Sequence, residues 1–87
     1  MDKQICEIIA KVRQMFRYDK RFKDILKTPA SVHCSETKNN EIELTSIIWC
    51  FYGYQIIVGK HRITYSPEHG NTEELTTYKN FDELLNM

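Results

Sequence analysis

The sequence predicts a single α+β domain, in which a long N-terminal helix packs on an antiparallel β-meander of three to four strands and a short helix ends the chain. Two observations predict this class. Residues 1–27 lack Gly and Pro and repeat apolar side chains at helical spacing, whereas residues beyond Pro29 alternate apolar and polar side chains as strands do. A chain of 87 residues has room for one hydrophobic core, so we expect one domain over residues 1–87.

The first expected element is a helix over most of residues 1–27. Its apolar stripe consists of Ile5, Ile8, Ile9, Val12, Met15, Phe16, Phe22 and Leu26. Thr28-Pro29 ends the helix, because a residue that precedes proline disfavours helical geometry. Asp19 interrupts the stripe and leaves two alternatives: the helix breaks at Tyr18 and Asp19 caps a second short helix, or the helix continues and a cation from the sheet meets Asp19.

Strands are expected after the proline. Residues 31–35 form a weak strand, and residues 38–40 (Lys-Asn-Asn) are typical of a turn. Residues 41–52 and 54–66 are rich in β-branched and aromatic side chains, so we expect one long hairpin whose turn contains Gly53.

The alternation divides the hairpin into two faces, whether its two-residue loop is Tyr52-Gly53 or Gly53-Tyr54. One face is apolar along nearly its whole length, from Ile42 to Tyr65, and the long helix is its expected cover. The other face is polar at the open end of the hairpin and apolar near the turn. Its apolar part, the aromatic hairpin face, consists of Ile47, Trp49, Phe51, Tyr54, Ile56 and Val58.

The last third of the sequence predicts a loop, one further element and a helix. Residues 66–71 form the loop. Residues 74–79 are expected to return as a fourth strand, with a short helix as the alternative. Asn80 and Glu83 have the spacing of a capping box, which predicts a terminal helix through Phe81 and Leu84-Leu85.

The aromatic hairpin face is the first candidate for a binding surface. Left bare, such a cluster rivals the largest apolar patches that monomers tolerate, so something should cover it. The cover is either the terminal helix or another chain. The leading hypothesis is therefore a non-enzymatic interaction module that binds a second copy, as a homodimer, or a host protein through this face.

A row of cations is the second candidate surface. Arg13, Arg17, Lys20, Lys23 and Lys27 follow one another at spacings of four, three, three and four residues, which places them along one flank of the expected helix. Such a row suits nucleic acid or an acidic partner, although it is also typical of a solvated helix flank. Twelve basic and twelve acidic residues cancel over the whole chain, which is atypical of nucleic-acid-binding domains.

The residue types used in catalysis and metal binding lack the spacing that either needs. Cys6, Cys34 and Cys50 are an odd number without a CxxC pair, which predicts free thiols. We expect no metal, no cofactor, no small-molecule substrate and no enzyme activity. A third hypothesis, a small RNase-like toxin, depends on His61 and Arg62.

No apolar run is long enough to span a bilayer and the chain begins without a signal-peptide segment, so we expect a cytoplasmic protein that does not associate with membranes. The order of a long helix, a meander and a short helix resembles that of many small phage- and plasmid-borne proteins, among them inhibitors of host defence systems and RelE-type toxins. This resemblance of plan implies an accessory or inhibitor protein of a bacterium or phage.

Overall fold

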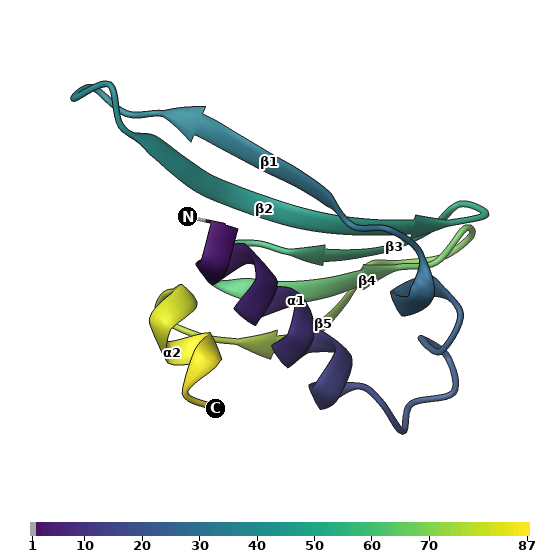
Figure 1. Cartoon of the computed structure of the whole chain (residues 1–87). Coiled ribbons are helices and arrows are strands. Elements are labelled where there is room, and N and C mark those ends of the chain that lie inside the picture. Colours follow the sequence, from purple (N-terminus) through teal and green to yellow (C-terminus); the bar gives the residue numbers. More distant parts are fainter. Residues whose placement is uncertain (1) are drawn as a thin grey trace.

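The structure, a computed structural model, describes residues 2–87. Its elements are α1 (Asp2–Met15), the 3-10 helix η1 (Ile25–Lys27), β1 (Ser31–Glu36), β2 (Ile42–Phe51), β3 (Tyr54–Val58), β4 (Arg62–Ser66), β5 (Glu73–Thr77) and α2 (Phe81–Leu85). The five strands form one antiparallel sheet in chain order, and the helices lie on one side of it (Figure 1). The predicted α+β class is confirmed, with five strands in place of three to four. No helix in residues 2–87 is both long and apolar enough to cross a membrane.

The single strand expected over residues 54–66 is two strands. β3 ends at Val58 and β4 begins at Arg62, and the backbone N–H of Gly59 donates to the carbonyl of Arg62 at 2.9 Å across the turn between them. Val58 pairs with Ile63, and both are fully buried. The sequence places these two residues on opposite faces of the hairpin, and the turn brings both onto one face.

A β-bulge in β2 also changes the expected alternation. His33 pairs with Ser46 and Cys34 pairs with Leu44, so Thr45 is an extra residue in β2. Its hydroxyl donates to the carbonyl of His33 at 2.9 Å. Leu44 and Ile47 are consequently both buried, although they are three residues apart.

Three further predictions agree with the structure. Tyr52 and Gly53 form the β2–β3 turn with φ of 48° and 85°, the positive values of a type I′ turn. β5 is the strand expected after the loop. The side chain of Asn80 accepts a hydrogen bond from the backbone N–H of Glu83 at 2.9 Å and caps α2.

The aromatic hairpin face is the core face of the sheet, and the expectation that the long helix covers the other hairpin face is wrong. Four of its six residues, Ile47, Trp49, Ile56 and Val58, have no exposed surface. Phe51 is half-buried, and Tyr54 keeps 38% of its surface exposed. Cys50, which follows Trp49 in β2 and is exposed, lies on the opposite, open face of the sheet.

The cover of this face comes from the N-terminal third of the chain. Ile8 and Val12 of α1 belong to the same buried cluster as Trp49. η1 contacts β2 and β3, and the ring of Phe22 lies 4.9 Å from that of Tyr65, centroid to centroid. The terminal helix α2 packs on α1 toward the other end of the sheet, so it is not the cover of the aromatic turn (Figure 1).

The N-terminal helix is shorter than expected, because α1 ends at Met15 and residues 16–24 form turns. Asp19 accepts from the backbone N–H of Arg21 at 2.9 Å, and this local bond competes with helical geometry. Of the two alternatives for Asp19, the helix break agrees better with the structure than the continuous helix does. The break comes before Tyr18, and a 3-10 turn follows in place of a second α-helix. The cation that meets Asp19 is Arg21, which is not in the sheet.

We predict that Trp49→Ala lowers the free energy of unfolding by about 3–5 kcal/mol, because it empties the centre of the core. Trp49→Phe should have a much smaller effect. It keeps an aromatic ring and removes an indole N–H that is buried without a hydrogen-bond partner among the described residues. Urea denaturation measures both, with Tyr18→Ala as the exposed control at about 1 kcal/mol or less. A Trp49→Ala protein as stable as the control would contradict the burial.

A second prediction concerns Tyr78, whose buried hydroxyl lies 2.5 Å from the carbonyl oxygen of Gly59 and 2.9 Å from that of Arg62. Burial raises the pKa of this phenol above its ordinary value. Because the hydroxyl hydrogen-bonds to carbonyl groups of the β3–β4 turn, Tyr78→Phe should destabilise the protein by about 1–2 kcal/mol. Tyr54→Phe, a control whose hydroxyl makes no hydrogen bond within residues 2–87, should change the urea midpoint little. Equal effects would refute the assigned role.

Candidate functional site

The strongest candidate site is a groove of about 560 Å³ beside the end of α1 and η1. Three apolar residues line it: Phe16, Phe22 and Leu26. Four cations line it as well: Arg13, Arg17, Lys23 and Lys27. We call it the basic groove.

The turn after Met15 builds the basic groove. On a straight helix, the row from Arg13 to Lys27 would extend over about 21 Å. Because the chain turns over residues 16–24, four of the five predicted cations instead border one concavity. Lys20 is exposed and does not line the groove. The prediction of a continuous basic helical flank is therefore wrong, although it selected four of the residues that the fold brings together.

The groove has an apolar floor. Phe22 has no exposed surface and Leu26 has 6%, whereas Phe16 is half-buried. The rings of Phe16 and Phe22 meet edge to face, with centroids 5.6 Å apart. Phe16 is therefore the floor residue whose ring can contact an apolar side chain of a ligand, while Phe22 and Leu26 support it from the core.

The rim carries positive charge that the chain itself does not neutralise. Arg13 Nε donates to the carbonyl of Leu26 at 2.9 Å, which fixes its guanidinium beside the groove. The guanidinium of Arg17 lies 4.8 Å from the centroid of the Tyr18 ring. None of the four groove cations belongs to an ion pair in the part of the chain that the structure describes. All four are exposed and able to contact an anion.

Arg21, in the same segment, has a structural role instead. It pairs with Asp19 at 3.0 Å and with Glu73 of β5 at 2.9 Å, and its guanidinium lies 4.6 Å from the centroid of the Phe22 ring. Hydrogen bonding to Asp19, and then to Glu73, raises the pKa of Arg21, and the same bond to Arg21 lowers the pKa of Asp19. Arg21 thus links the turn that shapes the groove to the sheet.

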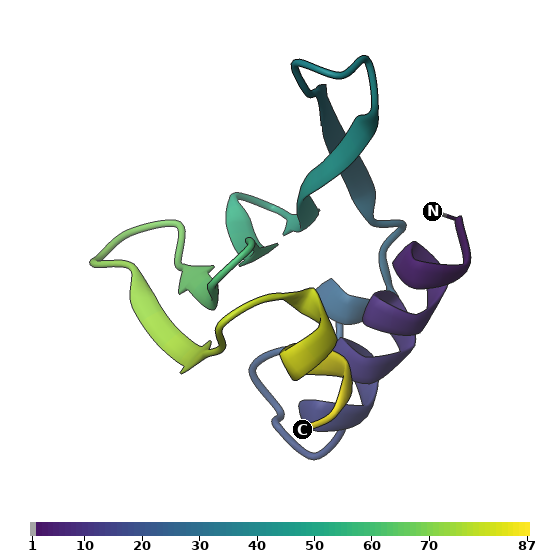
Figure 2. The same ribbon diagram turned by 90° about the vertical axis from the view of Figure 1, so that its left-hand side faces the viewer.

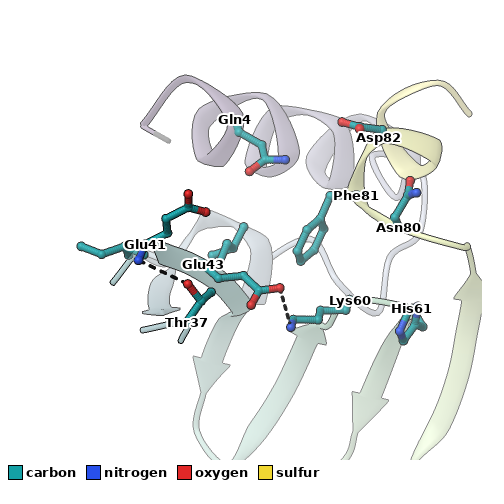
Figure 3. Close-up of a pocket in the computed structure, with 11 residues that line it drawn as sticks. Gln4, Thr37, Glu41, Glu43, Lys60, His61, Asn80, Phe81 and Asp82 are labelled. Carbon is teal, nitrogen blue, oxygen red and sulfur yellow. Dashed lines mark hydrogen bonds and ion pairs between the residues drawn. The ribbon is translucent and has the colours of Figure 1, made fainter. Parts of the chain in front are cut away.

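A second concavity, the polar cleft, lies between α1, α2 and the near ends of the strands (Figure 3). It measures about 720 Å³, and Phe81 points into it among charged and polar side chains. Several of its polar groups already serve the fold. Glu43 pairs with Lys60 at 2.7 Å, and Thr37 Oγ1 accepts from the backbone N–H of Glu41 at 3.2 Å. The cleft therefore offers less unneutralised charge than the basic groove.

The residues of the RNase-like hypothesis do not share a site. His61 lines the polar cleft, where its Nδ1 lies 2.8 Å from the carbonyl oxygen of Lys79. Because that oxygen can only accept, Nδ1 carries a proton. Arg62 does not line the cleft and lies 3.7 Å from a carboxylate oxygen of Glu74.

The three cysteines are free, as expected, and all are exposed. Within residues 2–87, no three His, Cys, Asp or Glu side chains lie close enough together to hold a metal ion.

The groove floor was missed because the sequence assigns its residues to the core stripe. A local pattern could have found it: Phe16, Phe22 and Leu26 are each followed directly by one of the groove cations. Neighbouring residues in a turn can present one apolar and one charged group to the same concavity. On a continuous helix the two would diverge by about 100°.

Acid should weaken the Asp19–Arg21 pair selectively. The folded-state pKa of Asp19 lies below its ordinary value of 3.8, so its contribution to stability is present above that value and is lost as the pH falls through the folded-state pKa. We predict that the urea midpoint of the native protein falls more than that of Asp19→Asn between about pH 5 and about pH 3. Equal falls in the two proteins would show that the pair contributes nothing.

Comparisons of the chain with protein-family models, with curated proteins and with solved structures found no match. What the protein does must therefore be inferred from its own residues and their geometry.

Proposed function

We propose that the protein is a non-enzymatic binding module that holds an acidic segment of another protein in the basic groove. The observation that carries this proposal is the combination of four exposed cations, which have no carboxylate partner among residues 2–87, and an apolar floor between them. The expected ligand segment has several Asp or Glu residues around one aliphatic or aromatic side chain.

The two parts of the groove supply different parts of the binding free energy. Ion pairs between exposed groups contribute about 0.2–1 kcal/mol each and weaken with salt. Apolar surface buried on the floor contributes about 25 cal/mol per Å² and is insensitive to screening. After the cost of association, this small site should bind a short peptide with micromolar or weaker affinity. Such affinity is typical of transient recognition.

A protein ligand fits the charges better than nucleic acid does. An extended phosphate backbone is best contacted by an extended row of cations. Here the row is interrupted, because Lys20 does not line the groove with the other four cations. The whole chain has no net charge, which gives little long-range attraction for a polyanion. Trp49, the largest candidate for base stacking, has no exposed surface.

The proposal excludes catalysis by the groove residues. Lys and Arg side chains can bind an anion, but general acid–base chemistry near neutral pH needs a group that titrates there. His61 lies in the polar cleft and does not line the groove. Anion binding by hydrogen bonds and charge is therefore what the groove residues support.

Fluorescence anisotropy with a labelled peptide that places one Leu between Glu residues tests the proposal. We predict that Arg17→Glu with Lys23→Glu weakens binding by about tenfold or more, because two attractive contacts become repulsive. The matched control, Lys38→Glu with Lys79→Glu, makes the same charge change at exposed residues outside the groove and should weaken binding much less.

Two comparisons separate this proposal from its alternatives. Replacing the peptide Leu with Ser should also weaken binding, because the apolar floor then loses its ligand. Equal losses for the groove and control variants would contradict the proposal. So would tight, salt-sensitive binding of a mixed-sequence RNA with no binding of the peptide, which would support the nucleic-acid hypothesis.

A further inference from the structure

The β1 edge of the sheet is open for pairing. β1 has a strand neighbour on one side only, and all six of its residues, Ser31–Glu36, are exposed. On its outer side the strand presents backbone N–H and C=O groups that the β1–β2 ladder does not use. From Ser31 to Ser35 the strand has no proline and no Lys, Arg, Asp or Glu side chain.

The opposite edge differs. β5 begins with Glu73 and Glu74, which pair with Arg21 and Arg62. Charged side chains on an edge strand discourage another strand from pairing with it. The sheet thus has one edge with charged residues and one edge without that protection.

The hairpin that carries the open edge also extends beyond the helices. Figures 1 and 2 show β1 and the first part of β2 projecting away from the rest of the molecule. Val32 of β1 keeps 41% of its surface exposed and Ile42 of β2 keeps 65%. A two-stranded ribbon is marginal in water without further strands or a cover.

We propose that β1 pairs antiparallel with β1 of a second copy across a two-fold axis, so that the two sheets become one. This surface is separate from the basic groove, and the inference does not depend on the function proposed above. The joined hairpins form a four-stranded region, which gives the projecting part of each copy the extra strands that it lacks.

A second copy is the occupant that the charges favour. The one charged residue of β1, Glu36, lies at its end, so an antiparallel pair centred near Cys34 places no like charges opposite each other. The same arrangement directs the hairpin tip, whose charged residues Glu36, Lys38 and Glu41 sum to one negative charge, toward the start of the second copy's β1. That strand follows Lys27 closely in the chain. A contact of one strand pair is small for a specific interface, so the dimer should dissociate on the order of 10 µM or weaker.

The three exposed cysteines report on three different surfaces. Single-cysteine variants keep Cys34 on the β1 edge, Cys50 on the open sheet face or Cys6 on α1, with the other two replaced by serine. In the proposed dimer the two Cys34 residues lie about 5–10 Å apart for any register near the strand centre. A short bismaleimide should therefore cross-link the Cys34 protein into dimers at about 100 µM and leave the Cys50 and Cys6 proteins largely monomeric.

Sedimentation of the native chain from about 1 to 500 µM provides the second measurement. We expect its mass to rise from monomer toward dimer. Val32→Lys should abolish the rise, because it places two charges in the strand pair, and the control Gln55→Lys in β3 should leave it intact. A monomer at every concentration, or cross-linking that favours Cys50 or Cys6, would overturn the proposal.

Discussion

Burial of one sheet face beneath the N-terminal third of the chain is the contact on which the other features depend. α1 and the 16–27 segment cover this face, and Ile8, Phe22 and Trp49 belong to the single buried cluster that results. A chain of 87 residues can bury only one such layer. The bulge at Thr45 and the turn at Gly59 orient Leu44 and Ile63 toward the same layer, which leaves the other sheet face open.

The same cover produces the candidate site. To bring Phe22 onto the sheet the chain must turn after Met15, and the Asp19–Arg21–Glu73 bridge holds that turn against β5. Phe22 and Leu26 bury their side chains in the core while the cations next to them stay exposed around the basic groove. One short segment thus supplies both core packing and the cations of the basic groove.

The sequence predicted the α+β class, a hairpin turn that contains Gly53, the strand β5 and the Asn80 cap, because each depends on local chemistry or on a simple period. The prediction from sequence failed where a single residue shifted the alternation of buried and exposed side chains along a strand. The extra residue Thr45 and the Gly59 turn each shifted the alternation, so Leu44 and Ile63 are buried on the same face as Trp49, whereas the sequence placed them on the opposite face. The basic groove could be predicted only in part, because its cations are local whereas the turn that gathers them depends on tertiary packing of Phe22.

A titration of the isotope-labelled protein with the Glu-Leu-Glu peptide, followed by amide and indole NMR signals, tests the central claim most directly: that one segment both covers the core and binds an acidic ligand. The account predicts that shifts concentrate in residues 13–27 and that the Trp49 indole proton stays protected from exchange throughout. Shifts spread over the open sheet face, or an indole proton that exchanges freely before the peptide is added, would contradict it.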